Sequence, residues 1–401
     1  MRLPAVLVLA LALILPGTAG AKDEDWGVAV RDLAKDGAVM TAGADGRVLF
    51  SFNPDQPLIP ASTLKIVTAA AALTTLGRDY RFTTDFRLSG SGDLYVIGRG
   101  DPLLVSEELA LIARALKEKG LTRVRDIYLD NGFFEPGLVL HGTARSLKPW
   151  DAYNGALCAN FNTIFVRVGP DRQVVTAEPQ TPLTDMGRKL AQESGLKGEV
   201  RFNLAENPET CLLYAGELLK EFLKQAGVEV QGQVAPAKGD LSKIPLYYRH
   251  PSSKDLAWVV SQLMEYSNNF IANQVFLTMG AEKYGPPATA EKTRRVVADF
   301  LKAHRIPQFH VEEGSGLSRR TTLTARQMIA VLQTFRPYRD LLRNKGSAWH
   351  KGGTLAGVKC LAGFFQPKKG EPIAFAIFIN SDRVRYHDPD MILKILQENS
   401  D

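Results

Sequence analysis

The chain has 401 residues, of which 45% are hydrophobic and 23% are charged, and its formal net charge at pH 7 is +6. This composition is that of an ordinary globular protein, and it excludes long disordered, low-complexity or repeat-built segments. The length exceeds what one hydrophobic core usually supports, so we expect two domains. The mild positive charge suits a cell-wall polymer or a membrane surface and is also common in exported proteins, while no clustered basic motif indicates nucleic-acid binding.

The N-terminus has the pattern of a secretory signal peptide. Arg2 precedes an unbroken apolar run, Ala5–Leu15, and Ala19-Gly20-Ala21 provides a small-residue cleavage site before Lys22. The run is shorter than the roughly 20 apolar residues that span a bilayer. We therefore expect residues 1–21 to be removed, leaving an exported, soluble protein of the periplasm with possible peripheral membrane contact.

Cysteines and histidines indicate neither a metal site nor a cofactor. The chain has three cysteines, Cys158, Cys211 and Cys360, and six scattered histidines, none with the spacing of zinc ligands. Export permits one disulfide, for which Cys158 with Cys211 is one possible pair.

The first predicted elements after the leader are a hairpin and a helix. Val39–Asn53 contains two alternating apolar runs joined through Asp45-Gly46. Leu64–Leu76 is rich in alanine and leucine, Pro60 stands where a helix can begin, and Gly77 is a plausible C-cap.

The next part of the chain, residues 81–249, mixes short strands and helices. We expect strands at Tyr80–Leu88, Asp93–Ile97 and Arg125–Leu129, and helices at Glu107–Lys119 and Leu212–Ala226.

From about Ser252 the pattern becomes strongly helical before it returns to strands. We expect helices at Ser252–Glu265, Asn269–Met279, Thr289–His304, Thr324–Phe335 and Asp388–Gln397, and strands at Val358–Phe365 and Ile373–Asn380. If the first and last strand groups pair in one sheet, the middle is an insertion. The predicted fold is α+β, with one domain formed by residues 22–80 and 250–401 and an inserted domain at 81–249.

The four residues Ser62-Thr63-Leu64-Lys65 place a hydroxyl and an amine three positions apart at the start of the predicted helix. Residues three apart share a helix face, so Ser62 and Lys65 are expected to be neighbours. A serine hydroxyl needs an adjacent base to act as a nucleophile, and a partly buried lysine can be that base. Alone, the pattern also fits a helix start with an exposed lysine.

A second motif, Ser267-Asn268-Asn269, lies between two predicted helices. Ser267 could relay protons to a leaving group, and Asn269 could bond to Lys65 and to a substrate amide. Helix capping is the alternative explanation for both residues.

A third motif, Lys351-Gly352-Gly353-Thr354, leads into the strand-like stretch Leu355–Phe365. Lys351 would favour the neutral form of a nearby lysine and attract a carboxylate. Gly353 would let a substrate backbone approach, while Thr354 could bind a carboxylate and offer its N–H to an oxyanion. A glycine turn with a surface lysine is the alternative.

The three motifs in this order resemble those of penicillin-binding proteins and class A β-lactamases. More narrowly, the chain is similar to the D-alanyl-D-alanine carboxypeptidase/endopeptidase family of the penicillin-binding-protein-4-like (peptidase S13) type. Glu313-Gly314-Ser315-Gly316-Leu317-Ser318-Arg319 is similar to that family's Asp-Gly-Ser-Gly-Leu-Ser-Arg, and Gly100-Asp101-Pro102 and the Leu129-Asp130 region also match. The resemblance implies an antiparallel sheet covered by helices, as in the transpeptidase domain of penicillin-binding proteins, with a large mixed α/β insert.

The resemblance also implies roles for individual residues. It makes Ser62 the acylated nucleophile, Lys65 its base, and Ser267, Asn269 and Lys351 the other catalytic residues. Substrate-binding residues would be Gly353 and Thr354, with Asp130 and Arg319 gripping the zwitterionic end of a diaminopimelate side chain.

One departure from the family pattern concerns carboxylate binding. Gly352 replaces the threonine that usually stands between the lysine and the glycine, so a hydroxyl that helps to hold the terminal carboxylate is missing. Glu313 also replaces the usual aspartate.

The function implied is serine-type hydrolysis of peptidoglycan stem peptides ending in D-Ala-D-Ala, or of their cross-links, with β-lactams as covalent inhibitors. No cofactor is required. Two alternatives stay open: a serine β-lactamase, which the long insert disfavours, and a non-catalytic muropeptide-binding protein on the same fold, which Gly352 alone supports.

Overall fold

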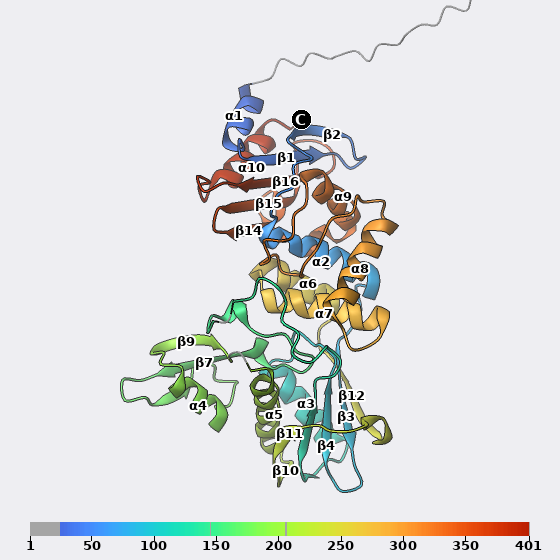
Figure 1. Ribbon diagram of the computed structural model, residues 1–401, viewed down its shortest axis with the longest axis vertical. Coiled ribbons are helices and arrows are strands. Elements are labelled where there is room, and N and C mark those ends of the chain that lie inside the picture. The colour runs from blue at the N-terminus through green and yellow to red at the C-terminus, as the bar shows by residue number, and fades with distance from the viewer. Residues whose placement is uncertain (1–24, 145, 205–206, 401) are drawn as a thin grey trace, which may run out of the picture.

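The computed structural model describes residues 25–144, 146–204 and 207–400, and the predicted signal peptide lies outside these residues. Within the described ranges, no helix combines the length and apolar character needed to cross a membrane. The molecule is elongated, with one large sheet and most helices in the upper part of Figure 1 and several smaller sheets in the lower part.

The upper part is built on a six-stranded sheet whose neighbouring strands are all antiparallel. Its strands, in spatial order, are β13 (Arg343–Lys345), β14 (Ala348–Leu355), β15 (Val358–Phe365), β16 (Ile373–Asn380), β1 (Gly37–Ala42) and β2 (Val48–Phe52). The pairing of β1 with β16 joins the two ends of the chain in one sheet, as predicted, and Gly37 lies opposite Ile379.

Helices cover both faces of this sheet (Figure 1). One face packs on α1 (Asp25–Leu33) and α10 (Asp388–Glu398). The other packs on a helical layer that comprises α2 (Leu64–Leu76), α6 (Leu256–Tyr266), α7 (Asn269–Tyr284), α8 (Ala290–Ala303) and α9 (Ala325–Phe335). Helix α2 is buried over most of its length, because its small alanines let neighbouring helices approach closely.

Residues of the middle segment form a separate hydrophobic cluster around helices α3 (Ser106–Glu118) and α5 (Pro208–Gln225). The largest sheet here has the order β11-β6-β4-β3-β12, and β3 and β12 are antiparallel neighbours at the two ends of the segment. Its strands are β3 (Thr83–Leu88), β4 (Leu94–Gly98), β6 (Ile127–Asp130), β11 (Val234–Pro236) and β12 (Leu246–Pro251).

A smaller sheet with the order β8-β7-β9 and a short parallel pair, β10 with β5, complete this segment. The remaining bounds are α4 (Asp185–Glu193), β5 (Arg123–Val124), β7 (Thr163–Val168), β8 (Val174–Thr176), β9 (Gly198–Asn203) and β10 (Glu229–Val230). Short 3-10 turns occupy Ala61–Thr63, Pro149–Asp151, Asn160–Asn162, Leu241–Lys243 and Arg336–Leu341.

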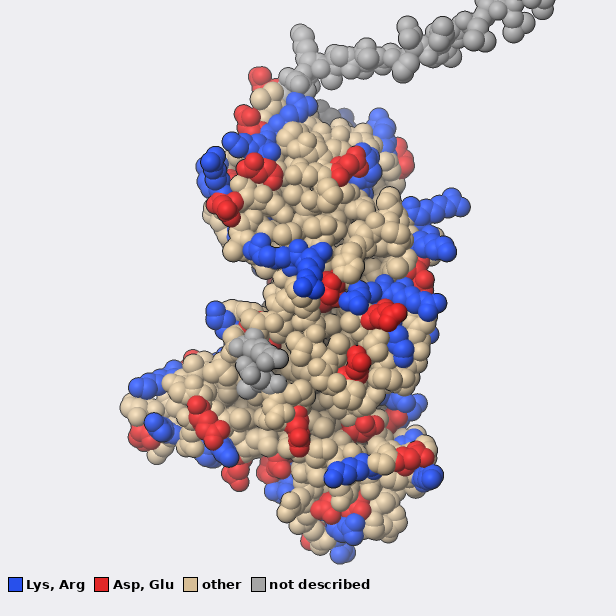
Figure 2. Space-filling view, in the orientation of Figure 1, with Lys and Arg blue, Asp and Glu red and all other residues tan. Residues whose placement is uncertain are grey.

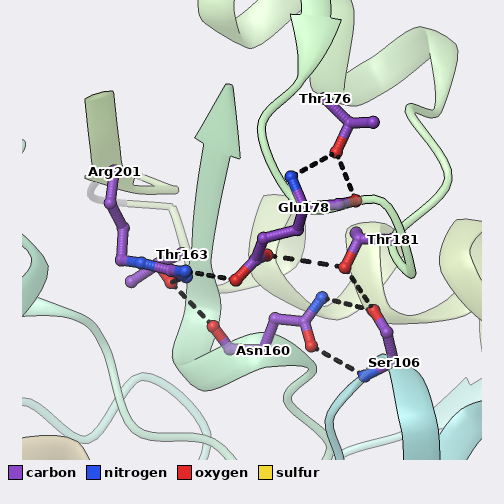
Figure 3. A network of polar contacts seen from close by, with 7 residues as sticks. All are labelled: Ser106, Asn160, Thr163, Thr176, Glu178, Thr181 and Arg201. Atoms are coloured by element: carbon purple, nitrogen blue, oxygen red, sulfur yellow. Dashed lines mark hydrogen bonds and ion pairs between the residues drawn. The ribbon is translucent and has the colours of Figure 1, made fainter. Parts of the chain in front are cut away.

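A tight turn before β7 has three consecutive non-glycine residues with positive φ, namely Asn160 (48°), Phe161 (59°) and Asn162 (52°). Such a backbone persists only where its surroundings hold it. The side chain of Asn160 bonds to both the N–H and the hydroxyl of Ser106 at the start of α3. Figure 3 shows how Thr181, Glu178, Arg201 and Thr163 extend this network back to the Asn160 carbonyl.

The same turn and the loop before it hold helix α7. The ring of Phe161 packs edge-on against Phe270, with centroids 6.0 Å apart. The buried Asn154 amide donates to the Phe270 carbonyl and to Gln274 Oε1, each at 3.0 Å, and Gln274 donates back to the Gly155 carbonyl. The middle segment therefore anchors the first turns of α7.

The predicted hairpin and helices lie close to their observed bounds, whereas two other expectations need correction. The third motif does not lead into a single strand Leu355–Phe365, since the chain turns at Ala356-Gly357 and the motif lies within its own strand, β14. Cys158 and Cys211 are buried free thiols and do not form a disulfide. Burial raises the pKa of the Cys158 thiol to about 12, so both side chains behave as small apolar groups.

Candidate active site

Ser62 lies in the 3-10 turn Ala61–Thr63, immediately before α2, and Lys65 lies in the first turn of that helix. The three-residue spacing brings the two side chains together as predicted, with Lys65 Nζ 3.0 Å from Ser62 Oγ. Two further acceptors complete the surroundings of Nζ: Asn269 Oδ1 at 2.8 Å and the Ser315 carbonyl at 2.6 Å. The amine is therefore fixed by three different segments of the chain.

Lys65 is fully buried, which is unusual for a lysine. Burial holds its pKa well below 10.5, and the nearby cation Lys351 lowers the pKa further, while Glu313 opposes the shift. A lysine with a lowered pKa can exist as a neutral amine near neutral pH and accept a proton.

The carbonyl of Ser315 is presented by the loop that contains the predicted Glu313–Arg319 stretch. The Glu313 side chain is completely buried and accepts bonds from the N–H groups of Ser315, Gly316 and Ser318 and from the Ser315 hydroxyl. Gly316 has φ +85°, and a Cβ there would lie 1.9 Å from the Ala61 carbonyl oxygen. This glycine therefore lets the loop pack directly against the turn that carries Ser62.

Neighbouring helices fix the other side of this loop. Thr68 on α2 donates to the Gly314 carbonyl at 2.7 Å, and the Gly314 N–H donates to Asn273 Oδ1 on α7 at 2.8 Å. The loop is thus held both by α2, which carries Lys65, and by α7, which carries the Lys65 partner Asn269. Sequence reasoning did not identify Thr68 or Asn273, because nothing in their local pattern separates them from other polar helix residues.

The second motif occupies the junction of α6 and α7. Ser267 ends α6 in a left-handed conformation (φ 55°), and Asn268 caps α7 by accepting the Ile271 N–H at 3.1 Å. Capping thus explains Asn268, while Asn269 points to Lys65 and Ser267 lines the cleft beside Ser62. The predicted bond between Asn269 and Lys65 is therefore present, while the role of Ser267 as a proton relay stays a prediction.

The third motif lies on β14, at the open side of the strand beyond its short pairing with β13. Lys351 is nearly buried, and burial, assisted by Arg343, lowers its pKa to about 8. A Cβ on Gly353 would lie 2.8 Å from the Ser62 backbone nitrogen and 2.9 Å from the Pro60 carbonyl oxygen. Only glycine lets β14 approach the Ser62 turn this closely, which brings the Thr354 backbone near the nucleophile.

These groups open onto a cleft of about 590 Å³. Figure 2 shows the molecule hollowed below the large sheet, with Lys and Arg side chains along the upper rim. The cations that line the cleft are Arg343, Lys345, Lys351 and Lys359, whereas its lining carboxylates are Glu265 and Asp390. The cleft therefore favours anionic ligands.

Gly352 faces a part of the cleft that could hold a side chain. A Cβ there would meet its nearest neighbour, Leu361 Cδ1, at 3.7 Å, an ordinary contact. The backbone therefore does not require glycine at this position, in contrast to Gly353. Beside it, burial lowers the pKa of His350 to about 4, so this imidazole is neutral at pH 7.

Two predicted substrate residues lie outside the set of residues lining this cleft. Asp130, at the end of β6, accepts the Gly132 N–H at 2.8 Å and so stabilises a local turn. Arg319 is exposed, and its guanidinium donates to the Ala356 carbonyl in the β14–β15 turn. No bond among the described residues joins Asp130 to Arg319, and their pairing stays a prediction. In the part of the chain that the structure describes, no cluster of three His, Cys, Asp or Glu side chains has metal-binding geometry.

Comparison with known proteins identifies a family and related enzymes. The model of the D-Ala-D-Ala carboxypeptidase 3 (S13) family matches residues 28–197 and 195–343. A D-alanyl-D-alanine carboxypeptidase from Actinomadura sp. (strain R39) is 26% identical in an alignment 436 positions long, gaps included, that covers 89% of this chain and 80% of that protein. The D-alanyl-D-alanine carboxypeptidase DacB of Haemophilus influenzae is 25% identical, with 83% of each chain covered.

Solved structures show the same fold. Penicillin-binding protein 4 (dacB) from H. influenzae superposes with a TM-score of 0.75 at 22% identity, covering 92% of this chain and 98% of that one. A predatory peptidoglycan endopeptidase from Bdellovibrio bacteriovorus superposes with a TM-score of 0.56 at 17% identity, covering 90% and 91%. The predicted fold class and enzyme class are thus confirmed, and the chain belongs to the D-Ala-D-Ala carboxypeptidase 3 (S13) family of peptidases.

Proposed function

We propose that this protein is a serine-type D-Ala-D-Ala carboxypeptidase that hydrolyses peptidoglycan stem peptides through an acyl-enzyme on Ser62. The observation that carries the proposal is the contact between Ser62 Oγ and the fully buried amine of Lys65. Family membership supports the reaction class, and the residue roles below are inferred from the geometry.

Lys65 can act as the base because its surroundings suit a neutral amine. A neutral lysine has two N–H donors and one lone pair. Asn269 Oδ1 and the Ser315 carbonyl would take the two N–H groups, so that the lone pair faces the Ser62 hydroxyl. Ser62 then attacks the carbonyl of the penultimate D-alanine as its proton passes to Lys65.

The remaining steps use the second and third motifs. The oxyanion is stabilised by the backbone N–H groups of Ser62 and Thr354, an arrangement supported by the close approach of β14 to the Ser62 turn. Ser267 relays the proton from Lys65 to the leaving D-alanine amine, and water then hydrolyses the ester. Lys351 keeps a positive charge beside the reacting groups and draws the substrate carboxylate into the cleft.

We further infer that the protein acts outside the cytoplasm, where peptidoglycan lies, and that β-lactams acylate Ser62. The signal-peptide pattern of residues 1–21 supports export to the periplasm. Cleavage of D-Ala cross-links by the same machinery is a second activity, which the open, 590 Å³ cleft favours because it leaves room for a second peptide.

Labelling with a fluorescent penicillin tests the nucleophile. The wild-type protein is expected to form a covalent adduct that survives denaturing electrophoresis, whereas Ser62→Ala is expected to form none. Thr74→Ala, a change on the same helix that leaves Ser62 in place, is the matched control. Equal labelling of the wild type and Ser62→Ala would refute the assignment.

Two further measurements separate the proposal from its alternatives. Release of D-alanine from a pentapeptide by the purified protein excludes a purely binding role, and its absence would favour one. Rapid multiple turnover of nitrocefin would instead favour a β-lactamase, since a carboxypeptidase is expected to stay acylated by a β-lactam and to release it only slowly.

A further inference from the structure

A carboxypeptidase must bind the free carboxylate at the end of its substrate, and in this chain one usual hydroxyl for that purpose is missing at Gly352. We propose that Lys359 binds the terminal carboxylate together with Thr354 and so takes over the role of the absent side chain. This inference rests on the proposed function, because it concerns the substrate of the same site.

Strand pairing places Lys359 beside the third motif. Lys359 on β15 lies directly opposite Thr354 on β14, and the residues of such a pair project from the same face of the sheet. Lys359 Nζ donates to Thr354 Oγ1 at 3.1 Å, and both residues line the cleft that contains Ser62. A carboxylate bound by the Thr354 hydroxyl would therefore lie within reach of the Lys359 ammonium.

Gly352 leaves space on this face of the strand pair. It is two residues before Thr354 on β14, so both positions face the same way, and Leu361 lies opposite it. A threonine at residue 352 would project beside Thr354, whereas glycine leaves the face open toward Lys359. The long lysine side chain can reach a ligand across this gap.

Lys359 also has hydrogen-bonding capacity to spare. An ammonium has three N–H donors, and among the described residues Lys359 donates one bond, to Thr354, and packs over the Tyr386 ring at 4.1 Å. No ion pair engages it within the described part of the chain, whereas Arg343 in the same cleft is paired with Glu265 at 3.3 Å. Lys359 can therefore meet an incoming carboxylate without breaking an existing ion pair.

Acylation by a penicillin and by its methyl ester tests the proposal, because the two compounds differ only in the carboxylate. Lys359→Met keeps the length of the side chain and removes its charge. We expect this variant to react about tenfold more slowly with the acid and within about twofold of the wild type with the ester. Lys359→Arg should keep the preference for the acid. Lys369→Met, at the far turn of the same hairpin, is the matched control and should behave as the wild type.

A double-mutant cycle then links Lys359 to residue 352. Gly352→Thr restores a hydroxyl, so it should accelerate acylation by the acid more in the Lys359→Met background than in the wild type. Equal effects of Lys359→Met on acid and ester, or no effect on either, would overturn the inference. If the wild type is acylated by neither compound, the proposed function itself fails, and the inference fails with it; the Ser62→Ala comparison identifies that case.

Discussion

The pH dependence of acylation is the sharpest consequence of the two buried lysines. Acylation needs neutral Lys65 and charged Lys351. Its rate should therefore rise with pH as Lys65 loses its proton, and it should fall at higher pH as Lys351 loses its proton in turn. The pKa of Lys351 is lowered to about 8 by burial and by Arg343, which places the alkaline limb near that pH. At pH 9 only about one-tenth of Lys351 stays charged, so the rate should be about tenfold below its maximum.

The second-order rate constant for acylation by a fluorescent penicillin, measured from pH 5 to 10, gives this profile. Arg343→Gln removes a cation that lowers the Lys351 pKa, so the alkaline limb should move to higher pH. Lys351→Arg keeps its charge throughout this range, so the limb should disappear. A wild-type rate that stays level up to pH 10, or a limb that is unmoved in both variants, would refute the assigned role of Lys351. Returning each sample to pH 7 and recovering full activity controls for unfolding.

Three further predictions concern packing. Gly353→Ala should reduce penicillin labelling by about a hundredfold or more, because its Cβ would lie 2.8 Å from the Ser62 nitrogen, whereas Gly352→Ala should fold and label at close to the wild-type rate. Asn154→Ala should lower the free energy of unfolding by about 1–3 kcal/mol and slow labelling, since it leaves the buried Gln274 Oε1 without this donor and removes a second bond to the Phe270 carbonyl; unchanged urea denaturation would contradict this. Thr324→Ala removes the capping box of α9 and should cost about 1 kcal/mol in the same assay, while Thr324→Ser should be nearly neutral.

Sequence reasoning succeeded where a segment determines its own structure. Leu64–Leu76 is helical with the predicted ends because its residues favour helix and Gly77 adopts φ 87° after the last turn. Thr324 caps α9 for similar local reasons. The contact between Ser62 and Lys65 also followed from spacing alone, even though Ser62 lies in a 3-10 turn, because residues three apart stay adjacent in both kinds of helix.

Partners that come together only through tertiary packing were not predictable. The Ser315 carbonyl at Lys65 depends on a loop whose shape is fixed by Thr68 and Asn273, each more than forty positions away in the chain. For Asp130 the structure shows a hydrogen bond from the Gly132 N–H within a local turn, and the predicted role of this carboxylate toward substrate stays a prediction. One sequence without its relatives does not show whether such a carboxylate stabilises a turn, binds a substrate or does both.

The hydrogen bonds of the buried Glu313 carboxylate explain why it does not form an ion pair with Lys65. Glu313 raises the pKa of Lys65, but its influence is smaller than those of burial and Lys351. Its carboxylate is occupied by three backbone N–H groups and the Ser315 hydroxyl, and no ion pair joins it to Lys65 within the described residues. A direct ion pair would hold Lys65 in its charged form, in which it cannot accept the Ser62 proton. By binding the loop backbone instead, Glu313 holds the Ser315 carbonyl in position beside Lys65 and leaves the amine free to act as a base.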